Sequence, residues 1–280
     1  MTIVVAGATG TVGRRIVAEL DAAGERVRAL SRSPERAALP ESVEVVEADL
    51  ADPESLRPAL VGATALHLIN FDAGGEHGPA PLRTGPEIVR LAVGAGVERI
   101  TVLLGAGDGN VEDAVSGSGI SWTFLKPVEF MTGALDWAES IRSEGVVREP
   151  FVERRSAMVH PADIGAVAAE VLTGEGHSGE TYVITGPQSL SVSDKVTVLS
   201  EVLGRELKLV EMSEDEARSQ WAAAGLPADV VDYLIGAMKE TPESGSTVSS
   251  TVEAVTGRKP LDFRQWAQEN IDAFDGPARR

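Results

Sequence analysis

Three glycines near the amino terminus are spaced like a phosphate-binding turn. Gly7, Gly10 and Gly13 come directly after the apolar run 3–6 and open a segment with helical spacing. In a strand–turn–helix unit, such glycines allow a tight turn, close approach of the backbone to a pyrophosphate, and close packing of helix on strand. The free amides and the dipole of the helix N-terminus would favour the negative charge. The pattern predicts dinucleotide binding, and the alternative is a glycine-rich turn without a ligand. The residues expected to hold the pyrophosphate are Gly7, Thr9, Gly10, Thr11, Val12 and Gly13.

The end of the second apolar run, Val27–Leu30, indicates which cofactor would bind. An acidic side chain here would bind both ribose hydroxyls of NAD(H) and repel a 2′-phosphate. The chain instead continues as Ser31, Arg32 and Ser33, and no acid follows before Glu35. A guanidinium contacts phosphate through a planar pair of hydrogen bonds, and the serines can donate further ones. We therefore expect NADP(H) rather than NAD(H), with a solvated surface role for Arg32 as the alternative.

Residues at the ends of the later apolar runs are expected to complete the cofactor site. Asp49 could accept a hydrogen bond from the adenine amino group, or it could cap a helix that starts near Pro53. Lys126 is the candidate catalytic group, because it could steady the nicotinamide ribose or stabilise negative charge that develops on a substrate. The alternative is a structural or solvated lysine. The further residues expected at the cofactor are Leu50 beside Asp49, Ile69, Asn70 and Phe71 on the adenosine side, and Gly105 together with Lys126 on the nicotinamide side.

Three residues are expected to face a substrate. Glu129 and Phe130 follow Lys126 closely, so they should line the crevice at the carboxyl edge of the sheet. His160 comes just before a predicted helix and is the third candidate, with a purely structural turn histidine as the alternative.

The other histidines carry less weight. His67 lies inside an apolar run and is expected in the core, and His177 lies in a glycine-rich turn. His77 lies in a glycine-rich loop and could reach a substrate if that loop forms a lid, although a surface histidine is the simpler expectation. No cluster of side chains has the spacing of metal ligands, so no metal is expected.

These residues require a parallel sheet to bring them together. Short β-branched runs without sustained alternation are typical of strands buried on both faces, and helix-compatible segments separate them. This order predicts a doubly wound α/β fold of the Rossmann type with right-handed crossovers. The expected strands are 3–6, 27–30, 43–46, 65–69, 100–104, 122–125 and 181–185, and the expected helices between them are 12–23, 53–61, 86–95, 110–118 and 161–172. Glycines expected to end helices in a left-handed conformation are Gly24, Gly62, Gly96 and Gly119.

The later part of the chain predicts a second lobe, because most aromatic residues lie there and the spacing of apolar residues is irregular. We expect residues 1–126 and 157–186 to form the NADP-binding domain, and residues 127–156 and 187–280 to form a smaller, mixed substrate lobe. Its helices are expected near 191–203, 213–224, 227–239 and 262–273.

The amino-acid composition limits the kinds of binding partner that we expect. The 280 residues include 43 Asp and Glu but 25 Lys and Arg, a formal charge of −18, which disfavours nucleic acid and anionic membranes. There are no cysteines, which excludes disulfides and thiolate chemistry. No apolar run reaches the length of a membrane span. We expect a cytoplasmic protein that binds a small-molecule substrate and could form a homo-oligomer.

Several motifs together resemble those of a known family. The motifs are Gly7-Ala8-Thr9-Gly10-x-x-Gly13, Ala29–Pro34, Glu47–Leu50, Thr123–Pro127, His160–Ile164 and Tyr182–Gly186. Their order and spacing resemble the atypical short-chain dehydrogenases/reductases, specifically the NmrA-like group that includes type 2 quinone oxidoreductases, over nearly the whole chain. The resemblance implies an NADP-binding Rossmann domain and a small C-terminal substrate lobe. It also implies reduction of a quinone, imine or activated alkene, although some members bind the dinucleotide as redox sensors.

The chain departs from short-chain dehydrogenases at the proton donor. Those enzymes use a tyrosine with a lysine four residues later, whereas Tyr182 is followed at that distance by Gly186 and Tyr233 by Ala237. Gly105 also stands where relatives often have a serine.

The absence of this proton donor limits which acceptors the protein could reduce. Hydride addition to a ketone produces an alkoxide, whose conjugate acid is nearly as weak as water with a pKa of roughly 15.7. Addition to a quinone produces a phenolate-like anion with a conjugate acid near that of tyrosine, about 10. We therefore expect an NAD(P)H-dependent reductase of a quinone-like or otherwise activated molecule. The alternatives are an NADP(H) sensor without catalysis, and an isomerase or cyclase without net redox chemistry.

Overall fold

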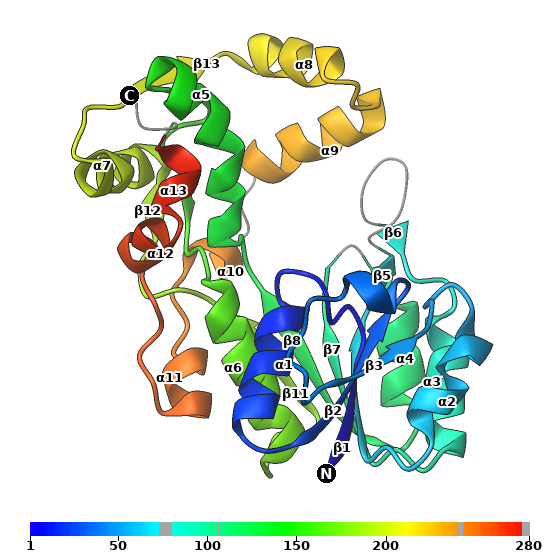
Figure 1. The fold of residues 1–280 in the computed structure, drawn as a ribbon. Coiled ribbons are helices and arrows are strands. Elements are labelled where there is room, and N and C mark those ends of the chain that lie inside the picture. The colour runs from blue at the N-terminus through cyan, green and yellow to red at the C-terminus, as the bar shows by residue number, and fades with distance from the viewer. Residues whose placement is uncertain (73–79, 106, 240–242, 276–280) are drawn as a thin grey trace. The chain divides into compact units, whose positions relative to one another are not determined.

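The computed structural model describes residues 1–72, 80–105, 107–239 and 243–275, and Figure 1 shows its ribbon. His77 lies outside the described residues. The chain divides into two compact units. The first consists of Met1–Pro127, Pro161–Ile184 and Thr251–Arg258, and the second consists of Val128–His160, Thr185–Ser250 and Lys259–Arg280. Compared with the expected division, residues 157–160 and 185–186 lie in the second unit, and residues 127 and 251–258 lie in the first.

The first unit is built on a seven-stranded sheet, which confirms the predicted doubly wound fold. The strand order is β11-β8-β7-β4-β1-β2-β3, and every neighbouring pair is parallel. Strand order reverses direction at β1, which is where ligands bind in such sheets. The strands are β1 (Thr2–Val5), β2 (Arg26–Ser31), β3 (Glu44–Glu47), β4 (Ala65–Ile69), β7 (Arg99–Leu103), β8 (Ser121–Pro127) and β11 (Glu180–Ile184).

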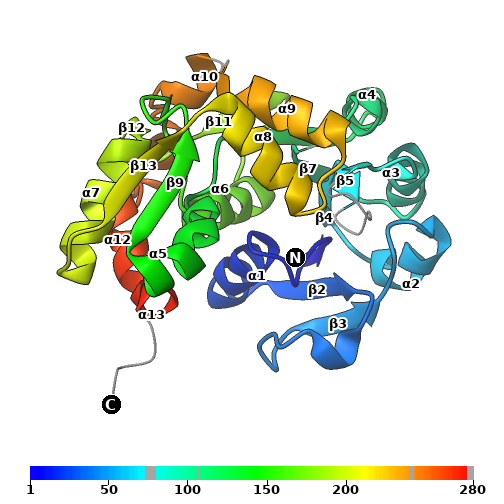
Figure 2. The same cartoon turned by 90° about the horizontal axis from the view of Figure 1, so that it is seen from above.

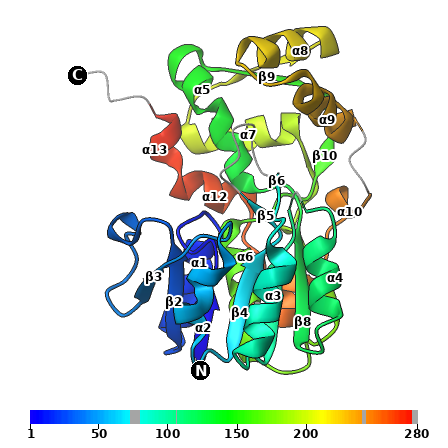
Figure 3. The same ribbon diagram turned by 90° about the vertical axis from the view of Figure 1, so that its right-hand side faces the viewer.

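Helices cover both faces of this sheet (Figures 1 and 3). One face carries α1 (Gly13–Ala22), α6 (Pro161–Thr173) and α11 (Thr251–Thr256), and the other carries α2 (Arg57–Leu60), α3 (Gly85–Gly94) and α4 (Asn110–Ser116). Short 3₁₀ turns occupy Pro34–Arg36 and Pro53–Leu56, and a two-stranded ribbon pairs β5 (Phe71–Asp72) with β6 (Ala80–Pro81). The predicted helix 53–61 is therefore a 3₁₀ turn followed by one short α-helical segment.

The core of the first unit is made of small aliphatic side chains, as their β-branched runs predicted. Val4, Leu66, Ile100 and Val102 are fully buried on the sheet. The four glycines expected to end helices all have positive φ angles, from 67° to 83°. Gly24 and Gly96 directly follow the C-caps of α1 and α3, as expected. Gly62 instead follows the extended Val61, and the C-cap of α4 is Gly117 rather than Gly119.

The second unit contains two small sheets and several helices (Figure 2). β9 (Val146–Pro150) pairs in parallel with β13 (Lys208–Met212), and β10 (Arg155–Ser156) pairs antiparallel with β12 (Leu190–Ser191). Trp266 packs in its core with Phe263 and Phe274. Its helices are the 3₁₀ helix η3 (Met131–Trp137), α5 (Ala138–Glu144), α7 (Val192–Leu203), α8 (Glu214–Ala223), α9 (Ala228–Lys239), α10 (Glu243–Ser246), α12 (Phe263–Glu269) and α13 (Ile271–Phe274).

Capping explains where three of these helices begin. Ser191, Ser213 and Asp262 each form a capping box, in which the side chain accepts from the backbone N–H three residues later and the acidic or amide side chain there accepts in return. The predicted helix 262–273 is interrupted at Asn270, so α12 and α13 are separate.

Candidate cofactor and substrate sites

The glycine turn is folded tightly against the start of α1. Gly7 has φ +64°, a conformation that favours glycine, and its carbonyl accepts a hydrogen bond from the Gly10 N–H at 2.9 Å. A Cβ on Gly13 would lie 2.0 Å from the Gly7 carbonyl oxygen, so no larger residue fits there without movement of the backbone. α1 therefore starts in direct contact with the turn that follows β1. This is the geometry that lets backbone amides face a pyrophosphate.

A cavity of about 190 Å³ lies beside this turn, in the first unit, at the carboxyl ends of β1, β2 and β4. It brings together many of the residues expected at the cofactor: Gly7, Thr9, Gly10, Arg32, Asp49, Leu50, Ile69 and Phe71. Leu30, Ser31, Ala48 and Asp72 complete its lining. The lining does not include Thr11, Val12, Gly13, Asn70, Gly105 or Lys126.

The charged groups at this cavity are one cation, Arg32, and two carboxylates, Asp49 and Asp72. Arg32 is exposed at the end of β2, and Ser31 is buried beside it with its Oγ accepting from the Ser33 N–H at 3.1 Å. Asp49 accepts from the Ala51 N–H at 2.9 Å, which fixes its carboxylate in a turn ahead of the 3₁₀ segment. The N-cap of that segment is Asp52 rather than Asp49.

Arg14 is a residue at this site that the sequence analysis did not identify. Its Nε donates to the Thr9 carbonyl at 2.9 Å and its Nη1 donates to the Ala38 carbonyl at 2.8 Å. Arg14 thus ties the glycine turn to the segment after β2 and places a positive charge beside both. Its position directly after the third glycine was the only signal in the sequence.

Asn70 has a different place from the one expected. It is 1 % exposed, its Nδ2 donates to Glu112 Oε1 at 2.9 Å, and its Oδ1 accepts from the Gly105 N–H at 2.7 Å. Asn70 therefore holds the loop after β7 instead of lining the cavity. A Cβ on Gly105 would lie 2.6 Å from the Phe71 ring, so glycine is required for this packing.

Lys126 is exposed near the end of β8, beside Val183 of β11. Among the described residues, Lys126 has no hydrogen-bond or ion-pair partner. This is compatible both with a role at a ligand and with a solvated surface lysine.

The second unit contains a buried charge cluster, which we call the Glu129 cluster (Glu129, Arg154, Ser156 and Lys195). Lys195 is 1 % exposed, and its Nζ lies 3.1 Å from Glu129 Oε1 and 2.9 Å from Ser156 Oγ. Arg154 Nη1 lies 3.0 Å from Glu129 Oε2. Glu129, expected to face a substrate, is thus held by two cations.

The electrostatics of the cluster follow from burial and pairing. Burial alone would raise the pKa of Glu129, but the charges of Lys195 and Arg154 outweigh it and hold that pKa below its usual value. Burial lowers the pKa of Lys195, and Glu129 opposes this shift. Burial also raises the pKa of the neighbouring Glu149. A hydrogen bond from Trp137 Nε1 to Glu149 Oε1, at 2.6 Å, opposes this shift without cancelling it.

The cluster could have been suspected from one feature of α7. Lys195 lies on the same helical face as Val192, Val196 and Leu199, all of which are buried, so a cation interrupts an apolar stripe. A buried lysine needs a partner, but nothing local in the sequence identifies Glu129, which is 66 residues away.

The remaining candidates are structural in position. Phe130 is half-buried and pairs with Val159. His160 is 1 % exposed, with its Nε2 3.3 Å from Glu269 Oε2. His67 is a core residue, as predicted: it lies 2.8 Å from Thr101 Oγ1, and burial lowers its pKa to about 4.

Tyr182 is held by a neighbouring side chain. The Tyr182 hydroxyl lies 2.8 Å from His177 Nδ1, and burial and Glu180 raise its pKa. In the described residues there is no group of three His, Asp or Glu side chains that could hold a metal, and no helix long and apolar enough to cross a membrane.

Comparisons with known proteins agree on one group. A family model described as NAD(P)H-binding matches residues 7–112. A (4-alkanoyl-5-oxo-2,5-dihydrofuran-3-yl)methyl phosphate reductase of Streptomyces griseus is 36 % identical, covering 97 % of this chain and 99 % of its own length. An NAD(P)H azoreductase of Xenophilus azovorans is 30 % identical, with the same coverage. Among solved structures, an NADPH-dependent quinone oxidoreductase from Escherichia coli matches with a TM-score of 0.80 at 24 % identity, covering 96 % of this chain and 99 % of the other.

Proposed function

Because the chain belongs to the NmrA-like group of atypical, NAD(P)H-binding short-chain dehydrogenases/reductases, we propose that it transfers hydride from NADPH to an electron-poor small molecule. The observation that carries this proposal is the cavity beside the Gly7–Gly13 turn, which has an arginine and no acid at the end of β2. Its full-length similarity to reductases supports the same conclusion.

The residues at the cavity fit NADP(H) in the following way. The amides of the turn would hold the pyrophosphate at the N-terminus of α1, with Thr9, Thr11 and Val12 beside it. Arg32 would contact the 2′-phosphate through its planar guanidinium, while Asp49 accepts from the adenine amino group. Leu50, Ile69 and Phe71 would pack against the adenosine. Bound in this way, the cofactor would supply a hydride, and the protein would supply binding and orientation.

The nicotinamide half would lie against the backbone of the loop that follows β7. Asn70 fixes the Gly105 N–H, and the absence of a side chain at Gly105 brings the backbone close to Phe71. Lys126 would stabilise negative charge on the acceptor after hydride addition, through its exposed ammonium group. The substrate itself would be held by the second unit, which contains the half-buried Glu129 and Phe130. His160 is 1 % exposed, so it would act on a substrate only through other residues.

The missing Tyr–Lys pair favours an acceptor that needs no acid in the transition state. The relatives' names include an acylated furanone phosphate, an azo compound and a quinone. For this chain we propose a conjugated carbonyl compound or a quinone, whose anion after hydride addition is stabilised by resonance and takes its proton from water.

The test is NADPH oxidation, followed by absorbance, with quinones, azo dyes and 2-acyl furanones, each alone and as a phosphate ester where one exists. We expect at least one acceptor to be reduced with one NADPH consumed per product. Tight NADPH binding without turnover of any acceptor would indicate a sensor instead. Product formation without loss of NADPH would indicate an isomerase or cyclase.

A further inference from the structure

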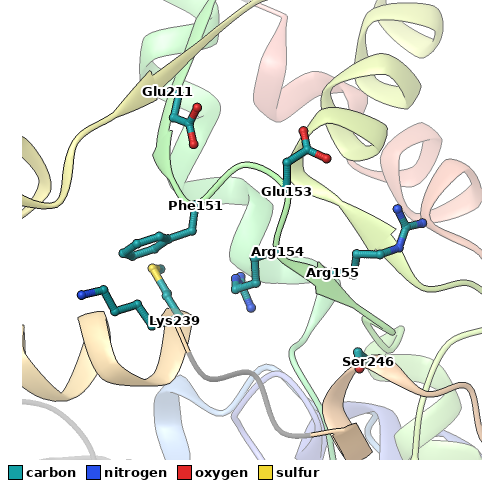
Figure 4. Close-up of a pocket in the computed structure, with 8 residues that line it drawn as sticks. Phe151, Glu153, Arg154, Arg155, Glu211, Lys239 and Ser246 are labelled. Atoms are coloured by element: carbon teal, nitrogen blue, oxygen red, sulfur yellow. The ribbon is translucent and has the colours of Figure 1, made fainter.

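The second unit has a cavity of about 460 Å³ whose lining includes Phe151, Arg154, Met238 and Lys239; we call it the Arg154 cavity (Figure 4). Three of its lining residues are cations, although the whole chain has a formal charge of −18. The other lining residues are Glu153, Arg155, Glu211 and Ser246.

Arg154 is the lining cation best placed to bind an anionic ligand. Its Nη1 lies 3.0 Å from Glu129 Oε2, yet that oxygen accepts no hydrogen bond among the described residues. The ion pair therefore fixes the guanidinium without using its N–H groups on Glu129. Glu129 Oε1 is also paired with Lys195, so Arg154 shares the compensation of this carboxylate with a second cation. In Figure 4 the Arg154 guanidinium lies in the space between Phe151 and Ser246.

The turn that carries Arg154 is strained where it faces the cavity. Phe151 has φ +53°, a left-handed conformation that is unusual for an aromatic residue, and its carbonyl accepts from the Arg154 N–H at 2.8 Å. This turn places an aromatic ring and a guanidinium on the same cavity. Such strain is common where a ligand is bound.

Lys239 supplies a second positive charge. Its Nζ lies 5.9 Å from the centre of the Phe151 ring, and it pairs with Glu214 at the surface. Exposed pairs of this kind are weak, so Lys239 is available to a stronger anion.

The carboxylates of the lining do not close the site to an anion. In Figure 4 the Glu153 carboxylate points away from the Arg154 guanidinium, and Glu211 is drawn beyond the Phe151 backbone. Arg155 also points away from it, and pairs with Asp194 at 3.1 Å.

We propose that the Arg154 cavity binds the phosphate monoester group of a substrate, with Arg154 and Lys239 as its charge partners and Phe151 and Met238 against the organic part; this rests on the proposed function. Two cations match a phosphate dianion better than a carboxylate monoanion. The Ser246 hydroxyl donates to the Glu243 carbonyl at 3.3 Å, so it is not counted among the phosphate's partners. A second cavity of about 610 Å³, lined in part by Trp137 and Trp221, shares Met238 with the Arg154 cavity.

The test is calorimetric titration of phenyl phosphate into the full-length protein saturated with NADP⁺, which keeps the ligand from the predicted 2′-phosphate site. We expect Arg154→Met to weaken binding by about tenfold or more and Lys239→Met by about threefold. Arg155→Met is the matched control, a neighbouring cation in the same lining, and should change affinity by less than about twofold. Benzyl alcohol should not bind.

Three outcomes would overturn the proposal: equal affinity of Arg154→Met and the unsubstituted protein, equal losses in Arg154→Met and Arg155→Met, or benzoate binding as tightly as phenyl phosphate. If Arg154→Met does not fold, as judged by circular dichroism, Lys239→Met decides, because its side chain is 46 % exposed. Phenyl phosphate has no bond that the enzyme could reduce. Arg154-dependent binding without any NADPH oxidation would therefore refute the proposed function alone, and oxidation without such binding would refute this inference alone.

Discussion

At the scale of single residues, the choice between two cofactors depends on Arg32. The side chain is exposed at the end of β2, where no acidic residue follows before Glu35. The carboxylates of the cavity lining, Asp49 and Asp72, come from other segments. Ser31 and Arg14 fix the backbone on either side, through the Ser33 N–H and through the Thr9 and Ala38 carbonyls. The guanidinium is thus presented on an ordered backbone, which lowers the entropic cost of contact with a phosphate.

Replacement of Arg32 should therefore separate the two cofactors. Arg32→Ala should weaken NADPH binding by about 10- to 100-fold, the equivalent of one charge-assisted pair of hydrogen bonds, and NADH binding by less than about twofold. Fluorescence titration measures both. Arg36→Ala is the control, since Arg36 is exposed and pairs only loosely with Glu35 at 3.7 Å. Equal losses for both cofactors would contradict the assignment.

Glu129 is expected to make stability depend on pH. Its pKa is lowered in the folded protein, so its contribution is present above about pH 4.5, the unfolded value, and is lost as pH falls through the folded value. Glu129→Gln should lower the free energy of unfolding at pH 7 by about 3–5 kcal/mol, because two buried cations lose their partner. The variant should also lose less stability than the parent between pH 5 and pH 3. Urea titrations across this range test it, and parallel pH curves would argue against it.

At the scale of elements, the sheet was predictable and the small strands were not. The strands of the first unit are continuous β-branched runs that end in glycine or polar turns, so their type is evident locally. β9 and β13 were missed because each is five residues long, carries charge and pairs with a partner some sixty residues away. The Glu129 cluster was missed for the same reason, since Lys195 shows its need for a partner but not the partner. Gly13, in contrast, could be assigned from spacing alone.

Gly13 should be the most sensitive position of the first helix. Gly13→Ala would bring a methyl group within 2.0 Å of the Gly7 carbonyl, so α1 must move from the turn. We expect a loss of about 1–3 kcal/mol in stability and a loss of NADPH binding. Gly236→Ala in α9 is the matched control, since nothing lies within 4 Å of the new methyl group. It should stabilise the protein by about 0.5–1 kcal/mol. Thermal unfolding and NADPH titration of both variants would show whether crowding, rather than loss of any glycine, is responsible.

At the scale of the whole molecule, the proposed function assigns different roles to the two units. The first unit carries the turn, Arg32 and the loop held by Asn70, and its fold follows from patterns that the sequence shows directly. The second unit carries two cavities, which share Met238, and a buried ion cluster, and these depend on pairings that only the folded chain reveals. Membership of the family is consistent with this division, because its members share the dinucleotide domain and differ in what they reduce.

The central claim is direct hydride transfer from NADPH to an electron-poor acceptor. It is tested most directly with NADPH deuterated at C4, in each of its two stereoisomers, and a 2-acyl furanone as acceptor, with the product examined by mass spectrometry and NMR. If hydride is transferred directly, we expect one stereoisomer to place deuterium on a carbon of the reduced product and the other not to do so. Reduced product without deuterium from either stereoisomer, or no reduced product from any acceptor in the panel, would contradict it.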